Sequence, residues 1–331
     1  PHTVAKICDK LDQVFGLDPN VEVSLEANPG SSDYAKFTDF AKAGVNRISL
    51  GIQALDDQAL RTLGRKHDKD EALTAIKAAT NAVDRVSIDL IYARPDQSLS
   101  AWQSELLEAI ALGTDHLSLY QLTIEPGTRF EAMVRRGELT PLADDQQAEL
   151  FEATNKLLAA QGFAAYEVSN YARKGAECQH NLIYWRYQSY LGIGPGAHGR
   201  VTDISNNTHV SSRASSRAST RNHRMPQAWL DKVTASGHAL QEWQALDLDE
   251  QFTETLLMGL RLQEPLSFQR LALIDHGLSE KLRSTLSDSK TLASFVTAGW
   301  LHHDDRGLVL TADGRMRLDA ITATLVNEVF S

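Results

Sequence analysis

Apolar and polar residues alternate in four short segments of the first half of the chain. In residues 47–53, three aliphatic residues alternate with Ser49, Gly51 and Gln53. This period of two predicts a strand with one apolar face and one small or polar face. The same phrase of an apolar residue, a serine, an apolar residue and a fourth, variable residue recurs at 23–26, 86–89 and 117–120. A serine at one fixed place in four strands predicts a crowded shared interior.

Segments with helical periodicity lie between these strands. After an opening helix over 1–15, helices are predicted at 31–43, 56–82, 99–112 and 144–161. Gly44, Gly113 and Gly162 stand where three of them should end. Regular alternation of strand and helix predicts a parallel sheet, in a barrel or in open form.

Four side chains with functional groups stand toward the carboxyl ends of these predicted strands. Period-two geometry places Glu26, Gln53, Asp89 and Tyr120 on the face that carries the serines. The carboxyl ends of parallel strands are where such folds place their chemistry. We therefore expect the four side chains to converge at one mouth. The alternative is that each one only caps the helix that follows it.

The pattern changes after Gly162. A strand is predicted at 166–171, and the glycine-rich run 190–199 is interrupted by Pro195, which favours a close backbone approach over a dinucleotide loop. Several helices and a hairpin at 300–311 then predict a mostly helical, winged-helix-like unit. The predicted domains are a core at 1–200, a flexible linker at 201–225 and a C-terminal domain at 226–331.

Composition narrows the class of protein. The 331 residues are 42% hydrophobic, and no run approaches the roughly 20 apolar residues that cross a bilayer. A formal charge of −10 argues against non-specific nucleic-acid binding. The two cysteines, Cys8 and Cys178, exclude a disulfide framework and a cysteine-based zinc site, and they suggest a cytoplasmic protein.

Three motifs carry a family resemblance. They are Ser-Leu-Glu-Ala-Asn-Pro at 24–29, Arg-Ile-Ser-Leu-Gly-Ile-Gln at 47–53 with Leu-Gly-Arg at 63–65, and Ile-Asp-Leu-Ile-Tyr at 88–92. With them the chain resembles radical S-adenosylmethionine (SAM) proteins of the oxygen-independent coproporphyrinogen III oxidase group, over almost its whole length. The resemblance implies an α/β fold, a partial (β/α)6 barrel with a smaller C-terminal domain of the HemN type. The segment His-Asn-Leu-Ile-Tyr-Trp at 180–185 resembles the heme chaperone branch, HemW.

The resemblance implies that Glu26, Gln53, Arg65 and Asp89 contact SAM, and the strand pattern adds Tyr120. The carboxylates can accept hydrogen bonds from the ammonium group or the ribose hydroxyls of SAM, and Arg65 can hold its carboxylate with paired donors. For Arg65 a surface salt bridge with a nearby acidic residue is the alternative. No catalytic residue is assigned.

His180 is a tentative heme ligand, because imidazole is a common axial ligand of heme iron. A hydrogen bond from its ring to a backbone carbonyl is the alternative. His198 and Cys178 are weaker candidates. Tyr184 and Trp185 can stack on a porphyrin or simply pack.

Two departures from the family pattern affect these expectations. The family holds a 4Fe-4S cluster with a Cys-x3-Cys-x2-Cys loop before the opening helix, and a cluster needs about three or four thiolates. With Cys8 and Cys178 alone, this chain is expected to hold no cluster and to lack the first strands of the barrel. Ala93, Arg94 and Pro95 stand where the family has Gly-Leu-Pro.

Three functions follow as hypotheses. The first is a heme chaperone that binds SAM and heme and delivers heme to respiratory proteins, with peripheral membrane contact and no nucleic-acid partner. The second is an oxygen-independent coproporphyrinogen III oxidase of porphyrin biosynthesis. The third is an inactive fragment. The sequence does not predict the oligomeric state.

Overall fold

The computed structural model describes residues 1–30, 34–202 and 217–330. The chain forms two units, Pro1–His180 and Asn181–Ser331, so the first unit ends before the predicted limit at residue 200. Residues 203–216 of the predicted linker lie outside the described residues, and the linker residues that are described include the end of one strand and the whole of the next.

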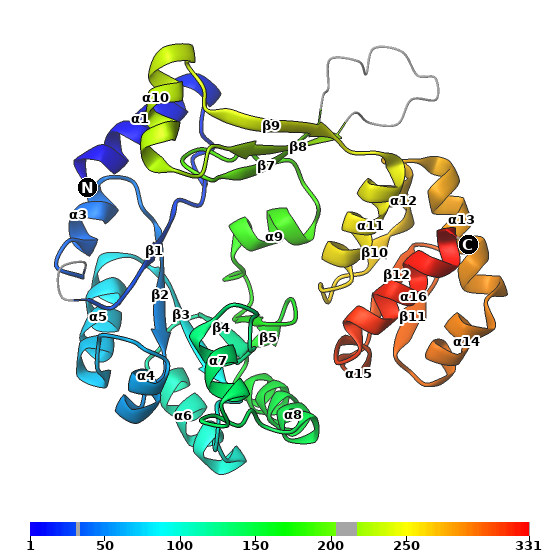
Figure 1. The fold of residues 1–331 in the computed structure, drawn as a ribbon, viewed down its shortest axis with the longest axis horizontal. Helices are drawn as coiled ribbons and strands as arrows, with labels where there is room; N and C mark the ends of the chain where they lie inside the picture. The colour runs from blue at the N-terminus through cyan, green and yellow to red at the C-terminus, as the bar shows by residue number, and fades with distance from the viewer. Residues whose placement is uncertain (31–33, 203–216, 331) are drawn as a thin grey trace. The chain divides into compact units, whose positions relative to one another are not determined.

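A six-stranded sheet organises the first unit (Figure 1). The strand order is β1-β2-β3-β4-β6-β5. The first four strands are parallel, as predicted, but β6 runs antiparallel to β4 and β5 antiparallel to β6. The strand predicted at 166–171 forms only at its end, as β6, and β5 lies just before the predicted range. The bounds are β1 Ser24–Ala27, β2 Arg47–Gln53, β3 Arg85–Tyr92, β4 His116–Gln121, β5 Ala164–Ala165 and β6 Asn170–Ala172.

Helices connect these strands. The helical region predicted at 56–82 contains two capped helices. Asp56 accepts a hydrogen bond from the N–H of Ala59 to begin α4, and Asp68 and Glu71 form a reciprocal capping box that begins α5. The helices are α1 His2–Phe15, α3 Phe37–Lys42, α4 Asp57–Thr62, α5 Lys69–Ala82, α6 Leu99–Ala111, α7 Arg129–Arg135 and α8 Asp144–Ala160.

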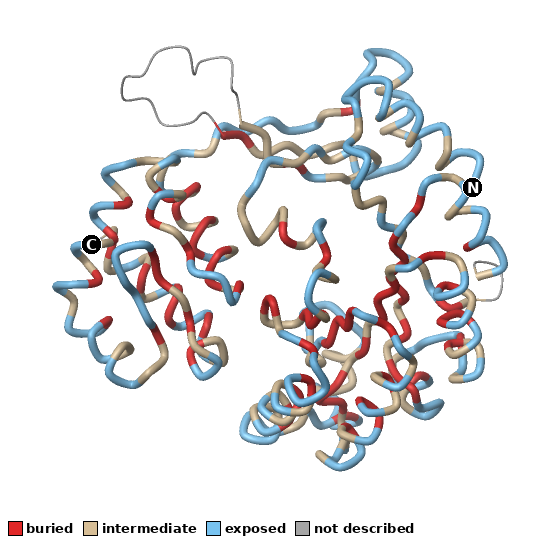
Figure 2. Tube along the Cα trace, turned by 180° about the vertical axis from the view of Figure 1, so that it is seen from behind, coloured by how far each residue is buried: buried red, intermediate tan, exposed pale blue. Residues whose placement is uncertain are grey.

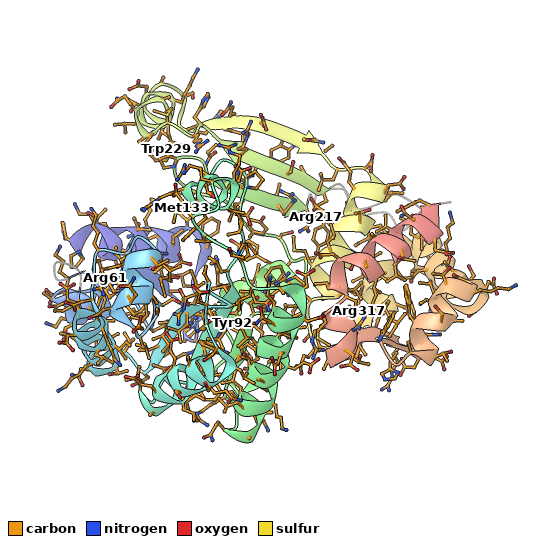
Figure 3. All side chains as sticks on the ribbon, turned by 60° about the horizontal axis from the view of Figure 1, so that its bottom comes forward. Arg61, Tyr92, Met133, Arg217, Trp229 and Arg317 are labelled. Atoms are coloured by element: carbon orange, nitrogen blue, oxygen red, sulfur yellow. The ribbon has the colours of Figure 1, made fainter. Side chains whose placement is uncertain are left out.

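The apolar side of the sheet forms the core of the first unit (Figure 2). Ile48, Leu50 and Ile52 of β2 are fully buried. Tyr92 of β3, which Figure 3 labels, stacks on Trp102 of α6 with ring centroids 4.9 Å apart. Burying each large side chain of this kind stabilises the fold by about 1.5–3 kcal/mol. The helices pack against this apolar face of the sheet. The other face carries small and polar side chains.

The strand register determines which residues of the polar face lie side by side on neighbouring strands. Ser49 of β2 pairs with Ser87 of β3, but Ser24 pairs with Arg47 and Ser118 pairs with Asp89. The four serines share a face without sharing a level, so the prediction of one fixed place was only partly right. A stagger of this kind is how strands tilt in barrel-like sheets.

The second unit contains two small antiparallel sheets (Figure 1). One is β7-β8-β9, which the sequence patterns did not predict, and it is followed along the chain by helices and then by the predicted hairpin, β11–β12. The elements are β7 His198–Thr202, β8 Arg217–Asn222, α10 Pro226–Ser236, β9 Leu240–Ala245, α11 Leu248–Gly259, β10 Leu266–Ser267, α12 Phe268–Ala272, α13 His276–Asp288, α14 Lys290–Thr297, β11 Leu301–His303, β12 Gly307–Leu310, α15 Ala312–Arg315 and α16 Leu318–Phe330. Helix α9, Gln179–Trp185, begins in the first unit.

Candidate functional site

Asp89 is the central residue of the polar face. It is partly buried in β3, and the hydroxyl of Ser49 donates to its carboxylate at 3.3 Å. Burial raises the pKa of Asp89 to about 6; hydrogen bonds from Ser118 and Ser49 oppose this rise, and the charge of Glu26 adds to it. A carboxylate held in this way is costly without a ligand and gains from a cation placed beside it.

Glu26 and Tyr120 lie on the same face as Asp89. Glu26 is exposed in β1 and pairs with Ser49 in register. Tyr120 is 43% exposed. Burial and then the charge of Asp89 raise the pKa of the Tyr120 hydroxyl. Glu26 pairs in register with Ser49, which bonds to Asp89, and Asp89 pairs in register with Ser118, two residues before Tyr120, so the three side chains lie on one face of the sheet.

Gln53 reaches this face in an unexpected way. A bulge in β2 places Gln53 opposite Leu90, and its φ is 74°. Simple alternation therefore fails at this residue. The side chain nevertheless turns back over the polar face, because a Cβ on Gly51 would lie 2.9 Å from the Gln53 amide nitrogen. Gly51 leaves the space that the Gln53 amide occupies.

Arg65 follows α4 in an exposed loop. The ring nitrogen Nε2 of His67 bonds the carbonyl oxygen of Ile52 at 2.9 Å, which fixes this loop against the carboxyl end of β2. Within the described part of the chain, Arg65 forms no ion pair with Asp68 or Glu71, both of which cap α5. The guanidinium thus remains available at the edge where Gln53 lies.

The Ala93–Pro95 segment begins with a residue in the left-handed conformation. Ala93 has a φ of 55°, a left-handed conformation that favours glycine. The guanidinium of Arg94 turns to the helix side and pairs with Glu105 of α6, where it borders a cavity of about 820 Å³. Arg94 therefore does not enter the polar face.

A buried polar chain lies beneath the site, and the sequence patterns did not predict it. His116 Nδ1 is 2.6 Å from the Ser87 hydroxyl, and its Nε2 is 2.8 Å from the Tyr166 hydroxyl. Burial, with the charges of Arg47 and Arg85, lowers the pKa of His116 to about 3, so the ring is neutral. The available signal was the position of His116, two residues before Ser118.

Asn170 of β6 is a further group that the sequence patterns did not predict. Its amide nitrogen donates to Glu167 at 2.5 Å, but its Oδ1 is buried without a hydrogen-bond partner among the described residues. Asn170 also faces the Tyr120 hydroxyl. A buried acceptor without a donor is unfavourable, and a ligand ammonium or amine would satisfy it.

His180 lies near the amino ends of the parallel strands, away from the carboxyl ends where Gln53 lies. The Glu22 carboxylate accepts from the backbone N–H groups of Gln179 at 3.1 Å and His180 at 3.2 Å, and it pairs with Arg85 at 2.7 Å. Burial alone would raise the pKa of Glu22, but these backbone bonds and the arginine charges lower it. Arg85 begins β3, so Asp89 lies roughly 13 Å further along that strand. His180 is exposed and is not part of the cluster around Asp89.

The other predicted heme contacts are spread over two units. Cys178 is buried, 3.6 Å from Glu22. In the second unit, Tyr184 packs edge-on against Tyr190, Arg261 lies 4.5 Å above the Trp185 ring, and His198 is exposed in β7. No group of three metal-binding side chains occurs among the described residues. Cys8 and Cys178 do not fit the thiolate requirement of a 4Fe-4S cluster.

Comparison with known proteins identifies the family. The profile of the Radical SAM superfamily matches residues 2–106, and that of the HemN C-terminal domain matches residues 246–317. The mitochondrial radical S-adenosyl methionine domain-containing protein 1 of Mus musculus is 38% identical over 334 residues, covering 99% of this chain and 73% of that protein. This chain belongs to the radical SAM family, in its HemN- and HemW-like group.

Two further relatives agree with this assignment. The heme chaperone HemW of Mycobacterium tuberculosis is 35% identical over 327 residues, covering 98% of this chain and 76% of that protein. The solved structure of coproporphyrinogen III oxidase (HemN) from Escherichia coli superposes with a TM-score of 0.75 at 20% identity, covering 98% of this chain and 74% of that one. The fold is therefore the radical SAM partial barrel followed by a mostly helical C-terminal region.

The polar face fits the chemistry of SAM. The ligand carries an ammonium and a sulfonium, which suit Glu26, Asp89 and the Asn170 acceptor, and a carboxylate, which suits Arg65. None of the described helices is long and apolar enough to cross a bilayer.

Proposed function

We propose that this protein is a heme chaperone of the radical SAM type, which binds SAM at the polar face and carries heme. The observation behind the SAM part is the cluster of Glu26, Asp89 and Tyr120 where the parallel strands end. Likeness to a relative named heme chaperone, over 98% of the chain, supports the heme part.

In this proposal each residue has a stated role toward SAM. Asp89 is ionised at pH 7, because its pKa is about 6, and it attracts the ammonium or sulfonium. Gln53 and Tyr120 bond to polar groups of the ligand, and Arg65 holds the carboxylate with two parallel donors. When bound, the family's 4Fe-4S cluster supplies the electron for radical chemistry. Cys8 and Cys178 do not fit that cluster, so the proposed function includes no radical step in this chain.

The cargo part of the proposal assigns His180 as the axial ligand of heme iron. Its exposure and its place at the first turn of α9, which Glu22 holds through two N–H groups, support this role. Delivery of heme to respiratory proteins, contact with a membrane surface and a cytoplasmic location belong to the same proposal.

Two titrations test the proposal. Calorimetry should detect SAM binding by the wild-type protein and a loss of at least tenfold in affinity for Asp89→Asn, with Asp84→Asn as an exposed control. Heme should bind with a shifted Soret band, and His180→Ala should weaken binding and change that band. Unchanged SAM affinity in Asp89→Asn would refute the SAM site. Absence of any Soret shift in the wild-type protein would refute the chaperone function.

A second candidate function is the oxidation of coproporphyrinogen III. The fold of HemN favours it, although 20% identity carries the fold alone. Decarboxylation of coproporphyrinogen III under anaerobic reduction would support this alternative, and heme binding without turnover would support the chaperone.

A further inference from the structure

An arginine cluster lies in the second unit, in a chain whose formal charge is −10. Among the described residues, its guanidinium groups interact with two carboxylates, those of Glu254 and Glu264. One arginine of the cluster follows α9, one follows α11, two come from β7 and β8, and one comes from α12. They are Arg186, Arg200, Arg217, Arg261 and Arg270.

One half of the arginine cluster is built around Glu254 of α11. Arg200 donates to both carboxylate oxygens, at 3.1 and 2.7 Å, and the Tyr187 hydroxyl donates at 2.7 Å. Arg217 lies 3.9 Å above the Tyr187 ring, at the start of β8 (Figure 3). Arg200 and Tyr187 therefore occupy the carboxylate of Glu254. Arg217 forms no ion pair with that carboxylate among the described residues.

The other half is built around Glu264. Arg186 binds it through paired bonds of 2.8 and 2.7 Å. Arg270 is near this pair, since burial first and then the charges of Arg186 and Arg217 lower its pKa against the opposing effect of Glu264. Arg261 stacks on Trp185 at 4.5 Å. Arg270, like Arg217, forms no ion pair among the described residues.

Three buried donors of this region have no acceptor within the described residues. They are Trp185 Nε1, Arg217 Nε and Arg270 Nη2. A buried N–H without an acceptor is unfavourable, and a buried cation without a counter-charge is more so. Two of these donors belong to Arg217 and Arg270, which are cations. Together the three donors would be satisfied by an anionic ligand with several oxygen atoms.

We propose that the arginine cluster binds the propionate carboxylates of a tetrapyrrole, with Arg270 and Arg217 as the main contacts. This inference rests on the proposed heme chaperone function. A planar carboxylate matches the paired donors of a guanidinium, and a tetrapyrrole offers two of them on one edge. Leu257, which is 46% exposed one turn after Glu254 on α11, provides apolar surface beside the charges.

The test compares heme with its dimethyl ester, in which both propionates are blocked. Wild-type protein should bind heme at least tenfold more tightly than the ester, as followed by the Soret band. Arg270→Gln should weaken heme binding about tenfold and leave ester binding unchanged, and Arg270→Lys should recover part of the loss. Arg283→Gln is the matched control, because Arg283 also has a buried Nε without a hydrogen bond among the described residues, but it lies outside the cluster, where it stacks on Phe268 and pairs with Glu280 at 3.5 Å.

Each outcome decides between the two proposals. Equal binding of heme and ester by the wild-type protein refutes the propionate site and leaves the chaperone function standing. The same refutation follows if Arg270→Gln and Arg283→Gln lose equal affinity, or if both variants bind heme and ester as the wild type does. If the wild-type protein binds neither compound, the chaperone function fails and the propionate site fails with it.

Discussion

Replacing Asp89 with asparagine should stabilise the folded protein while it removes SAM binding. The pKa of Asp89 is raised from 3.8 to about 6. Each pKa unit corresponds to about 1.36 kcal/mol, so ionised Asp89 costs the native state up to about 3 kcal/mol at pH 7. Asparagine has nearly the same shape and can still accept hydrogen bonds from Ser49 and Ser118, without the desolvated charge.

The pH dependence has a definite sign. Because the native state holds the Asp89 proton more tightly than the unfolded chain, native protein binds more protons between about pH 4 and pH 6. The free energy of unfolding should therefore fall as pH rises through this window. The Asp89→Asn variant lacks this contribution, so its advantage over the wild type should be near zero at pH 4 and about 1–3 kcal/mol at pH 7.

Urea unfolding followed by circular dichroism, at steps from pH 4 to pH 8, measures this difference. Asp84→Asn, at an exposed position just before β3, controls for the loss of one surface charge. A difference between Asp89→Asn and wild type that does not change with pH would refute the reasoning. So would a variant that is less stable than the wild type at pH 7.

Three other substitutions test single contacts. Gly51→Ala should displace the Gln53 amide, because the new Cβ would lie 2.9 Å from it; calorimetry should show at least threefold weaker SAM binding. His116→Leu should leave the hydroxyls of its two partners unsatisfied and lower the free energy of unfolding by about 2–4 kcal/mol in urea titrations. Glu105→Gln should leave the charge of Arg94 buried and unpaired, and thermal unfolding should show a loss of about 3–5 kcal/mol.

Period-two patterns predicted the polar face because each parallel strand alternates strictly. They could not predict the level of each residue along the strands, because register depends on how strands pair. Ser118 thus faces Asp89 rather than Ser87. At Gln53 the bulge breaks the alternation, and only the absent side chain of Gly51 lets the amide return.

Helix periodicity was less informative where caps intervene. The apolar stripe runs through 56–82, but Asp68 and Glu71 satisfy the first N–H groups of α5 and so begin a new helix. The predicted helical region gave no boundary between the two helices, although the capping residues are visible in the sequence. The short reversal of β5 and β6 left no such local signal, because two- and three-residue strands are too short to show a period.

Contacts between distant segments set the rest of the site. His116 is held by Ser87 and Tyr166, which lie on either side of it in the chain, and a sequence pattern cannot show that these three meet. The arginine cluster has the same origin, since its members lie between residues 186 and 270 and share no local motif. Their significance appears only when burial and unsatisfied donors are known.

The two edges of the sheet hold different chemistry for a physical reason. At the amino edge, Glu22 is fully occupied by Arg85 and by the N–H groups of Gln179 and His180, so its charge is neutralised by the protein itself. At the carboxyl edge, Asp89 accepts from hydroxyl groups and forms no ion pair with a guanidinium among the described residues; burial raises its pKa, although the charge of Arg47 opposes the rise. A carboxylate that the fold does not neutralise stabilises a bound cation more than one that is already paired. We therefore expect the acid at the amino ends to stabilise the fold and the acids at the carboxyl ends to bind the proposed ligand.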